Sequence, residues 1–249
     1  IRKFPPRSLT LDKLVEVGTL TARCAQFLKL CIQGRVNLIV SGGTSTGNTT
    51  FLNALTEFIP DDERIITIED TPELSLQQRN WVRLCSVRSL KGDSVSTRDC
   101  LINALRMRPD RIIVGECRRN ETFEMLQAMN TGHSGSLTTV HANTPRDCLS
   151  RIESLVLSHA DFPLLPLRKQ ITAAIDLIVQ LRRDKSGERI VTEILELTGI
   201  EGEVITAQSI FGLNAMEEAE PTGILPKLSE KLKEKGLVIP PGFFDPGRP

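Results

Sequence analysis

The sequence predicts an α/β fold with a mostly parallel sheet covered by helices on both faces. Short apolar strands alternate with amphipathic helices from residue 36 onward, and a glycine-rich turn joins the first of these strands to its helix. A third observation is the length of 249 residues, which allows one large α/β domain with extra pieces or two small domains. In either arrangement the chain can bury a sizeable core.

The segment before the alternating region is expected to be the end of a larger unit. Residues 1–8, IRKFPPRS, are typical of a strand end followed by a linker that proline interrupts. A strand with no partner ahead of it indicates that an upstream domain is missing, so residues 1–35 are expected to be the end of a truncated N-terminal domain with linker helices. Apolar residues at helical spacing predict a helix over 21–33, which Gly34 ends.

Strands and helices then alternate over residues 36–199, the expected central domain. The predicted strands are NLIVSG, RIITIED, RIIVGE and SLTTVH, and the predicted helices cover 49–58, 97–107, 121–129 and 145–156. Three later segments, AIDLIVQL, RIVTEILEL and EVITAQSI, are predicted to be antiparallel strands. Residues 200–249 are expected to form a C-terminal strand and a helical tail, with a short helix in ILPKLSEKLKEKG.

Composition narrows the classes of protein that the chain could be. Acidic and basic residues number 31 each, so no global basic field draws the chain to nucleic acid or to an anionic membrane. The longest apolar runs are too short to cross a bilayer. Six cysteines are scattered without a C-x-x-C pair, which is typical of buried thiols in a reducing cytoplasm. We therefore expect a cytoplasmic location, no direct membrane insertion and no nucleic-acid partner.

The stretch VSGGTSTGNTTFLNAL has the strand, turn and helix in which the phosphate-binding pattern G-x-x-x-x-G-K-[ST] occurs. Glycines let the backbone N–H groups of such a turn point inward, toward the positive end of the following helix. We call residues 42–50 the glycine-rich loop and expect it to hold the phosphates of a nucleotide such as ATP. Its residues are Gly42, Gly43, Thr44, Ser45, Thr46, Gly47, Asn48, Thr49 and Thr50. The alternative at this stage is a turn rich in glycine and threonine that binds nothing.

Asn48 stands where the pattern has lysine, and its side chain is shorter and uncharged. A charge-assisted hydrogen bond contributes about 1.5–3 kcal/mol, so nucleotide binding is expected to weaken yet survive. The rate of hydrolysis is expected to suffer more than binding, because loss of one preorganised hydrogen-bond donor to the transition state costs roughly 10²–10³ in rate. Ser45 also adds a side chain where such a loop needs either a positive φ or a close approach of the backbone to phosphate. Thr49 can still offer its hydroxyl to Mg²⁺.

Carboxylates and histidines follow the next strands. Glu69 and Glu73 lie in ITIEDTPEL, and Glu116 follows RIIVGE, at strand ends where open α/β folds bind ligands. A solvated turn is the commoner explanation for one such cluster alone. His133 and His141 flank SLTTV, so each could approach a site from one end of that strand. Without cysteine or carboxylate partners they do not predict zinc.

Together these segments, in this order, resemble the secretion ATPase superfamily, which drives type II and type IV secretion and pilus assembly. The likeness is closest to its CpaF-type branch, the motor of Tad (Flp) pili. It rests on SGGTSTGNTTFLNAL, RIITIEDTPELSLQQ, TRDCLINALRMRPDRIIVGECR, MLQAMNTGHSGSLTTVHANTPRDCLSRIESLV and QITAAIDLIVQL. It covers almost the whole chain and implies a RecA-like P-loop NTPase core with late antiparallel strands and a short C-terminal helical tail.

The resemblance also implies roles for particular residues. It makes 42–50 the Walker A loop, 69–73 the Asp box, 112–116 the Walker B strand and 132–141 the His box. Glu69, Glu73 and Glu116 would position Mg²⁺ and polarise the attacking water, with Thr49 and Glu116 as metal ligands. His133 and His141 would couple the nucleotide state to the fold of the subunit. Arginines commonly complete such sites, and the candidates are Arg106 and Arg118, with Arg98 third.

By the same resemblance the chain is an ATP- and Mg²⁺-dependent motor subunit, a homo-oligomer in a hexameric ring, held at the inner membrane by a platform protein. The family pattern at the loop is close to GGTGSGKTT, so Ser45, Thr46 and Asn48 depart from it, and bulky Arg119 departs after the Walker B strand. These departures leave two alternatives open: a ring subunit impaired in hydrolysis, or a decayed copy. A nucleic-acid motor of the related RecA-like kind is disfavoured by the balanced charge.

Overall fold

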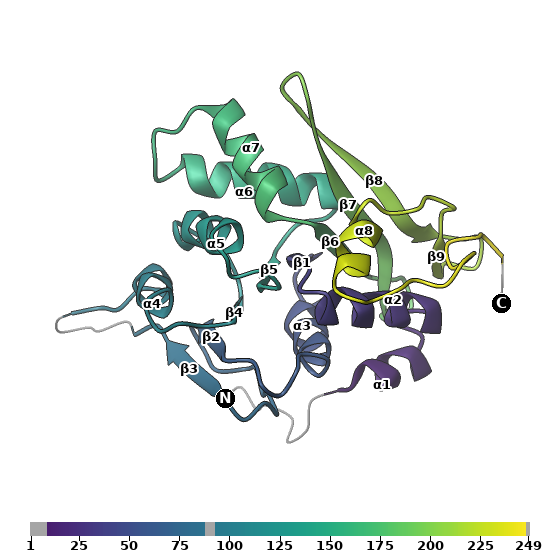
Figure 1. Cartoon of the computed structure of the whole chain (residues 1–249), viewed down its shortest axis with the longest axis horizontal. Coiled ribbons are helices and arrows are strands. Elements are labelled where there is room, and N and C mark those ends of the chain that lie inside the picture. Colours follow the sequence, from purple (N-terminus) through teal and green to yellow (C-terminus); the bar gives the residue numbers. More distant parts are fainter. Residues whose placement is uncertain (1–8, 88–92, 248–249) are drawn as a thin grey trace.

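One sheet runs through the molecule (Figure 1). The computed structural model describes residues 9–87 and 93–247, and within them nine strands pair in the order β3-β2-β4-β5-β1-β6-β7-β8-β9. The strands are β1 Leu38–Gly42, β2 Ile65–Glu69, β3 Trp81–Cys85, β4 Arg111–Val114, β5 Leu137–Val140, β6 Leu177–Arg183, β7 Arg189–Glu201, β8 Val204–Leu213 and β9 Ala219–Pro221. The strand expected in IRKF lies outside the described residues.

The direction of the strands divides the sheet into two parts. Every pairing from β3 across to β6 is parallel, and every pairing from β6 to β9 is antiparallel. The mostly parallel α/β fold is therefore confirmed. The prediction for AIDLIVQL needs a correction, because β6 is antiparallel only to β7 and pairs in parallel with β1. The two helices between β5 and β6 carry the chain back to the edge of the sheet at which the parallel strands begin. The next strand, β6, can therefore run parallel to β1.

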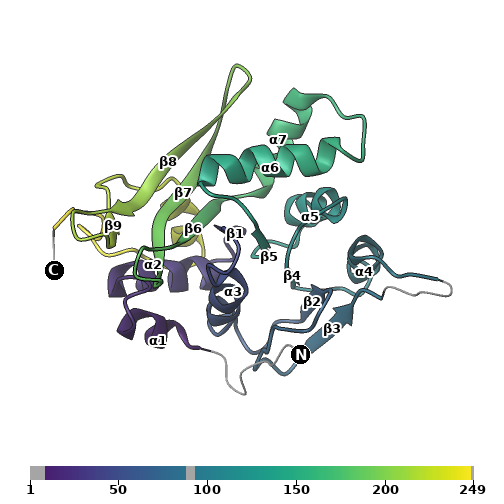
Figure 2. The same cartoon turned by 180° about the vertical axis from the view of Figure 1, so that it is seen from behind.

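Helices cover both faces of the sheet. They are α1 Leu11–Glu16, α2 Ala22–Gln33, α3 Asn48–Thr56, α4 Thr97–Ala104, α5 Glu121–Asn130, α6 Pro145–Leu157, α7 Leu164–Ala174 and α8 Leu228–Glu234. Helices α1, α2, α3 and α8 pack into one buried apolar cluster, whereas α4 to α7 pack into a second. The two groups lie on opposite sides of the strands in both views (Figures 1 and 2). None of these described helices has the length and apolarity needed to cross a membrane.

Helices α3 to α6 begin close to the residues at which the sequence predicts their starts. The predicted helix over 97–107 is shorter, because the chain leaves α4 through tight turns after Ala104. Four elements were not predicted: α1, α7, β3 and β9. Two prolines around the start of α7 favour a loop in the sequence, yet one caps this helix and the other lies in its first turn, where proline is tolerated. Strand β3 is a half-buried edge strand, so it carries no continuous apolar run.

Asn37 fixes the start of the central strands relative to one another. Its side-chain amide donates to the Ala174 carbonyl at 2.7 Å, and its Oδ1 accepts from the Gly135 N–H at 2.7 Å. Its own backbone N–H donates to Oδ2 of Asp176 at 2.8 Å. Since Asn37 precedes β1, Gly135 precedes β5 and Asp176 precedes β6, one buried residue links the beginnings of three strands through its side chain and its backbone.

The C-terminal tail is part of the core. The helix predicted in ILPKLSEKLKEKG is α8, and the tail beyond it places the Phe244 ring 5.5 Å from that of Phe27 in α2 and 6.1 Å from that of Phe211 in β8. The boundary drawn between residues 199 and 200 falls inside β7, and β8 continues the same sheet. The last strands and the tail thus pack against the first helices.

We predict that Phe244→Ala lowers the free energy of unfolding by about 3–5 kcal/mol, because it removes a buried aromatic ring from this cluster. Denaturant unfolding followed by circular dichroism measures the change. Leu225→Ala is the matched control, since Leu225 is 70% exposed and its truncation should cost less than about 0.5 kcal/mol. Equal stability of Phe244→Ala and the unchanged chain would show that the tail does not contribute to the core.

Candidate functional site

The candidate site lies at the carboxyl edge of the parallel strands. Because β1, β2, β4 and β5 run in the same direction, their C-terminal ends meet at one edge of the sheet. A cavity of about 100 Å³ opens there. It is lined by Thr49, Ile68, Glu69, Asp70, Thr71, Glu73, Thr97, Gly115, Glu116 and Arg118. Four separate segments therefore contribute polar side chains to one small pocket.

The glycine-rich loop connects β1 to α3 through two residues with positive φ. Gly47, at +90°, is the residue before the first turn of α3, and Ser45 has φ +65°. Of the two requirements expected at Ser45, the structure shows the positive φ. Gly42 is sterically required as well, because a Cβ there would lie 2.4 Å from the Thr46 hydroxyl oxygen. Positive φ values of this kind occur in turns that direct backbone N–H groups at an anion.

The Asn48 side chain is used inside the loop. It is 6% exposed, and its amide nitrogen donates to the Gly42 carbonyl oxygen at 3.0 Å. The Thr46 hydroxyl lies 3.0 Å from Asn48 Oδ1 and 2.8 Å from the Gly43 carbonyl oxygen. Asn48 therefore ties the two ends of the loop together, and it brings no positive charge to the space where phosphates would lie.

Glu69 ends β2 and is almost fully buried. Its Oε1 accepts hydrogen bonds from the backbone N–H groups of Glu73 at 2.9 Å and Leu74 at 3.0 Å. Its Oε2 is buried and has no hydrogen-bond partner among the described residues. Burial raises the pKa of Glu69, and the two backbone hydrogen bonds oppose that rise. A buried carboxylate oxygen without a partner is suited to a water molecule or a cation.

Glu116, just beyond β4, is the centre of a charged group. Its Oε1 lies 3.3 Å from Nε2 of His141, and its Oε2 accepts from the Arg118 guanidinium at 2.5 Å. Partial burial alone would raise the pKa of Glu116, but the hydrogen bonds from His141 and Arg118 outweigh it, so this pKa is lowered. The same contact with Glu116 raises the pKa of His141. These residues hold Glu116 ionised beside the pocket.

The residues suit Mg²⁺ only together with a ligand. Within the described part of the chain, no three His, Cys, Asp or Glu side chains are arranged to hold a metal ion by themselves. Mg²⁺ usually binds through one or two carboxylates, waters and the phosphates of a nucleotide. Thr49 and Glu116 line the same pocket as Glu69, whose Oε2 has no hydrogen-bond partner among the described residues. The donor set therefore fits a magnesium ion that arrives with a phosphate ligand.

The structure brings most of the sequence-predicted residues to this edge, but not all of them. Thr49, Glu69, Glu73, Glu116 and Arg118 line the pocket, and His141 reaches it through Glu116.

Three other candidates lie elsewhere. His133 precedes β5 and Arg106 precedes β4, so both are at the opposite edge of the sheet. Arg98 pairs with Glu124 of α5 at 2.7 Å. The sequence shows that His133 and His141 flank one strand, but not which end of that strand faces the site.

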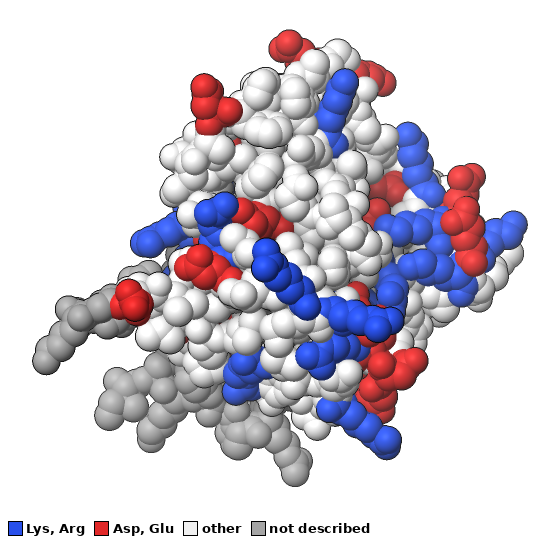
Figure 3. All heavy atoms as spheres, turned by 60° about the vertical axis from the view of Figure 1, so that its left-hand side comes forward, with Lys and Arg blue, Asp and Glu red and all other residues white. Residues whose placement is uncertain are grey.

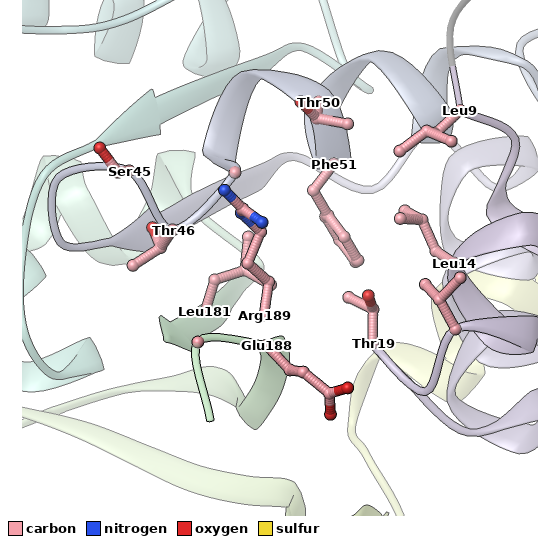
Figure 4. A pocket seen from close by; sticks show the side chains of 13 residues that line it. Leu9, Leu14, Thr19, Ser45, Thr46, Thr50, Phe51, Leu181, Glu188 and Arg189 are labelled. Carbon is pink, nitrogen blue, oxygen red and sulfur yellow. The ribbon is translucent and has the colours of Figure 1, made fainter. Parts of the chain in front are cut away.

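A larger cavity of about 540 Å³ adjoins the other side of the glycine-rich loop (Figure 4). It is lined by Leu9, Leu14, Val17, Thr19, Ser45, Thr46, Gly47, Thr50, Phe51, Leu181, Gly187, Glu188 and Arg189. One wall is apolar and the other is the loop, which suits a nucleoside next to its phosphates. The sequence reasoning did not identify this cavity, because its lining comes from α1, α3 and the turn between β6 and β7.

Charge on the surface is mixed. On the face drawn in Figure 3, basic and acidic side chains lie interspersed, without a broad area of one sign. This agrees with the balanced composition of the whole chain.

Comparison with known proteins gives a consistent result. Residues 1–214 match the family described as type II/IV secretion system protein. A putative conjugal transfer protein from Mycobacterium tuberculosis is 37% identical over 207 residues, 82% of this chain and 58% of that protein. The type IV secretion system protein VirB11 from Bartonella henselae is 41% identical over 172 residues, 68% of this chain and 48% of that protein. The chain thus spans about half the length of such relatives.

Solved structures agree with the fold. The VirB11 ATPase from the Brucella suis type IV secretion system, in complex with sulphate, has a TM-score of 0.64 at 31% identity over 76% of this chain and 56% of that chain. The pilus retraction motor PilT with bound ADP has a TM-score of 0.56 at 26% identity, covering 95% of this chain and 59% of that chain.

We predict a pH-dependent contribution of His141 to stability. Its raised pKa means that the contact with Glu116 stabilises the fold fully below about pH 6.5, the unfolded value, and that this stabilisation is lost as pH rises through the folded pKa. The difference in unfolding free energy between the unchanged chain and His141→Asn should therefore be larger near pH 6 than near pH 8.5. Denaturant titrations at both pH values measure it.

The control uses the partner carboxylate. In a Glu116→Gln background the effect of His141→Asn should become nearly independent of pH, because the opposite charge is gone. A pH dependence that persists undiminished without Glu116 would assign the shift to another group.

Proposed function

Since the chain belongs to the type II/IV secretion system protein family, we propose that it is the ATP-binding motor part of a secretion or conjugal-transfer machine. It would couple hydrolysis of Mg-ATP to the export of protein or the assembly of pilin. In this proposal residues 36–199 are the nucleotide-binding domain, and residues 200–249 extend the same sheet. The relatives named for conjugal transfer and type IV secretion support this class of machine.

The observation that carries the proposal is the meeting of Thr49, Glu69 and Glu116 in one pocket, beside a glycine-rich loop with positive φ at Ser45 and Gly47. Two similar proteins support a phosphate-bearing ligand such as a nucleotide, because the Brucella VirB11 structure contains sulphate and the PilT structure contains ADP. The phosphates would lie against the N–H groups of residues 43–49 and the first turn of α3. The nucleoside would enter the larger cavity on the other side of the loop.

Each carboxylate at the edge has a distinct task in this proposal. Thr49 and Glu116 would hold the magnesium ion, and the bound ion would offset negative charge on the phosphate oxygens. Glu69 is the candidate to orient the attacking water and accept its proton, because burial raises its pKa and one of its oxygens has no partner among the described residues. Glu73 donates its backbone N–H to Glu69 and keeps it in place.

Arg118 and His141 both contact the Glu116 carboxylate. Arg118 is 59% exposed while it pairs with Glu116, so its guanidinium could turn toward a phosphate that reaches the pocket. His141 would keep Glu116 ionised and report the state of the pocket to β5. Exchange of Arg118 between Glu116 and a phosphate would connect nucleotide binding with the fold of the subunit.

A second candidate function is a ring subunit that binds nucleotide and hydrolyses it slowly. The observation that favours it is the loop itself, in which Asn48 bonds to the Gly42 carbonyl oxygen and supplies no charge. Such a subunit would serve the ring by occupying a position in it. A decayed copy of a motor gene is the remaining alternative.

Membership of the family supports a proposal for the assembly and its location. We propose a homo-oligomer, a hexameric ring, that lies in the cytoplasm and is held at the inner membrane by a platform protein. The narrower assignment to a CpaF-type motor of Tad pili rests on the sequence resemblance, whereas the curated relatives are named for conjugal transfer and type IV secretion.

We predict that Asn48→Lys raises the rate of ATP hydrolysis at least tenfold, because it restores a charged donor to the loop. The measurement is phosphate release under saturating Mg-ATP, with and without an N-terminal domain joined from a relative. Asn48→Lys combined with Glu116→Gln is the control and should return to the background rate. If the unchanged chain already hydrolyses ATP as fast as Asn48→Lys, the argument that the missing lysine limits hydrolysis is wrong.

A further inference from the structure

The larger cavity has one positively charged side chain beside the glycine-rich loop, among the described residues that line it. Of the described residues that line it, Arg189 alone has a positively charged side chain, and Glu188 alone has a negative one. In Figure 4 the Arg189 guanidinium points toward the glycine-rich loop, whereas Glu188 points away from it. The charge that faces the loop from this cavity is therefore positive.

Arg189 lies beside the residue that precedes Asn48. A Cβ placed on Gly47 would be 3.2 Å from Cδ and 3.7 Å from Nε of Arg189. The lysine of the phosphate-binding pattern would begin one residue further along. The Arg189 side chain thus lies beside the backbone one residue before the position of this lysine, although it comes from the opposite wall of the cavity.

The hairpin that carries Arg189 is held in place. In its turn, the backbone N–H of Asp184 donates to the Glu188 carbonyl oxygen at 2.8 Å, and the Glu188 N–H donates back to Asp184 Oδ1 at 2.8 Å. Further along β7, the Val191 N–H donates to the Thr19 carbonyl oxygen at 2.7 Å. The position of the Arg189 backbone relative to the loop is therefore determined by the fold.

The other two arginines of the hairpin have partners. Arg182 pairs with Glu217 at 3.4 Å, and Arg183 donates to the Gly187 carbonyl oxygen at 3.0 Å. The Arg189 side chain makes no hydrogen bond or ion pair within residues 9–87 and 93–247. A guanidinium without a partner can bind a phosphate through two parallel hydrogen bonds.

We propose that Arg189 supplies, from the hairpin between β6 and β7, the positive charge that the glycine-rich loop lacks at Asn48. It binds the phosphates of the nucleotide in place of the missing lysine. This inference rests on the proposed nucleotide-binding function and deepens it. Asn48 closes the loop through its bond to Gly42, and Arg189 carries the charge.

The test compares four ligands, namely ATP, ADP, AMP and adenosine, by calorimetric titration of the unchanged chain and Arg189→Gln. We expect Arg189→Gln to weaken the binding of ADP and ATP about tenfold or more. This factor corresponds to the loss of a charge-assisted hydrogen bond. Binding of adenosine should not change. Arg189→Lys should recover part of the loss, and Arg183→Gln, on the same hairpin, should bind all four ligands as the unchanged chain does.

A second arm tests whether Arg189 replaces the lysine. In the Asn48→Lys background, the loss of ADP affinity caused by Arg189→Gln should fall to about threefold or less, because the new lysine then holds the phosphates. An equal loss in both backgrounds would overturn the replacement. An equal loss for adenosine and ADP would overturn a phosphate contact and place Arg189 against the nucleoside.

The outcomes separate the two proposals. If the unchanged chain binds ADP and Arg189→Gln binds it equally well, the role of Arg189 is wrong and nucleotide binding stands. If neither the unchanged chain nor Asn48→Lys binds any nucleotide, the proposed function fails, and the role of Arg189 fails with it.

Discussion

The parallel pairing of β1 with β5 and β6 is the constraint on which the site depends. The side chain and backbone of Asn37 join the starts of these three strands through bonds of 2.7–2.8 Å. With the starts aligned, the parallel strands end at one edge, and the glycine-rich loop leaves β1 beside the segments that follow β4 and β5. A change in the register of β1 would move the loop away from Glu116 and His141 together.

At that edge, charged side chains lie near the loop position at which Asn48 replaces a lysine. Glu116 is kept ionised by His141 and Arg118, while burial makes Glu69 a stronger base. Asn48 satisfies the backbone of the loop and adds no charge. In the proposed nucleotide complex, positive charge near the phosphates would therefore come from outside the loop, and Arg118 and Arg189 line the pockets on its two sides. The loop would provide shape and N–H groups, whereas other elements would provide charge.

Much of the parallel half of the fold was predictable from local patterns. Apolar runs bounded by turn residues indicated β1, β2, β4 and β5, and the helices between them carried periodic apolar faces. The predictions failed where burial is partial or where context overrides a residue's preference. Strand β3 has no apolar run, and α7 contains a proline in its first turn. The direction of β6 depends on which strand lies beside it, and no local pattern states that.

The sequence alone determined the order of the motifs and the family that they resemble, because strand, turn and helix signals are local and so is the loss of lysine at Asn48. It also placed Glu69 and Glu116 at strand ends. Only the tertiary structure decided that His141 meets Glu116 while His133 lies at the opposite edge, since this depends on the direction of β5 across the sheet. It also decided that Arg189, more than a hundred residues after the loop, lies beside Gly47. Side chains so far apart in the chain become neighbours only through packing.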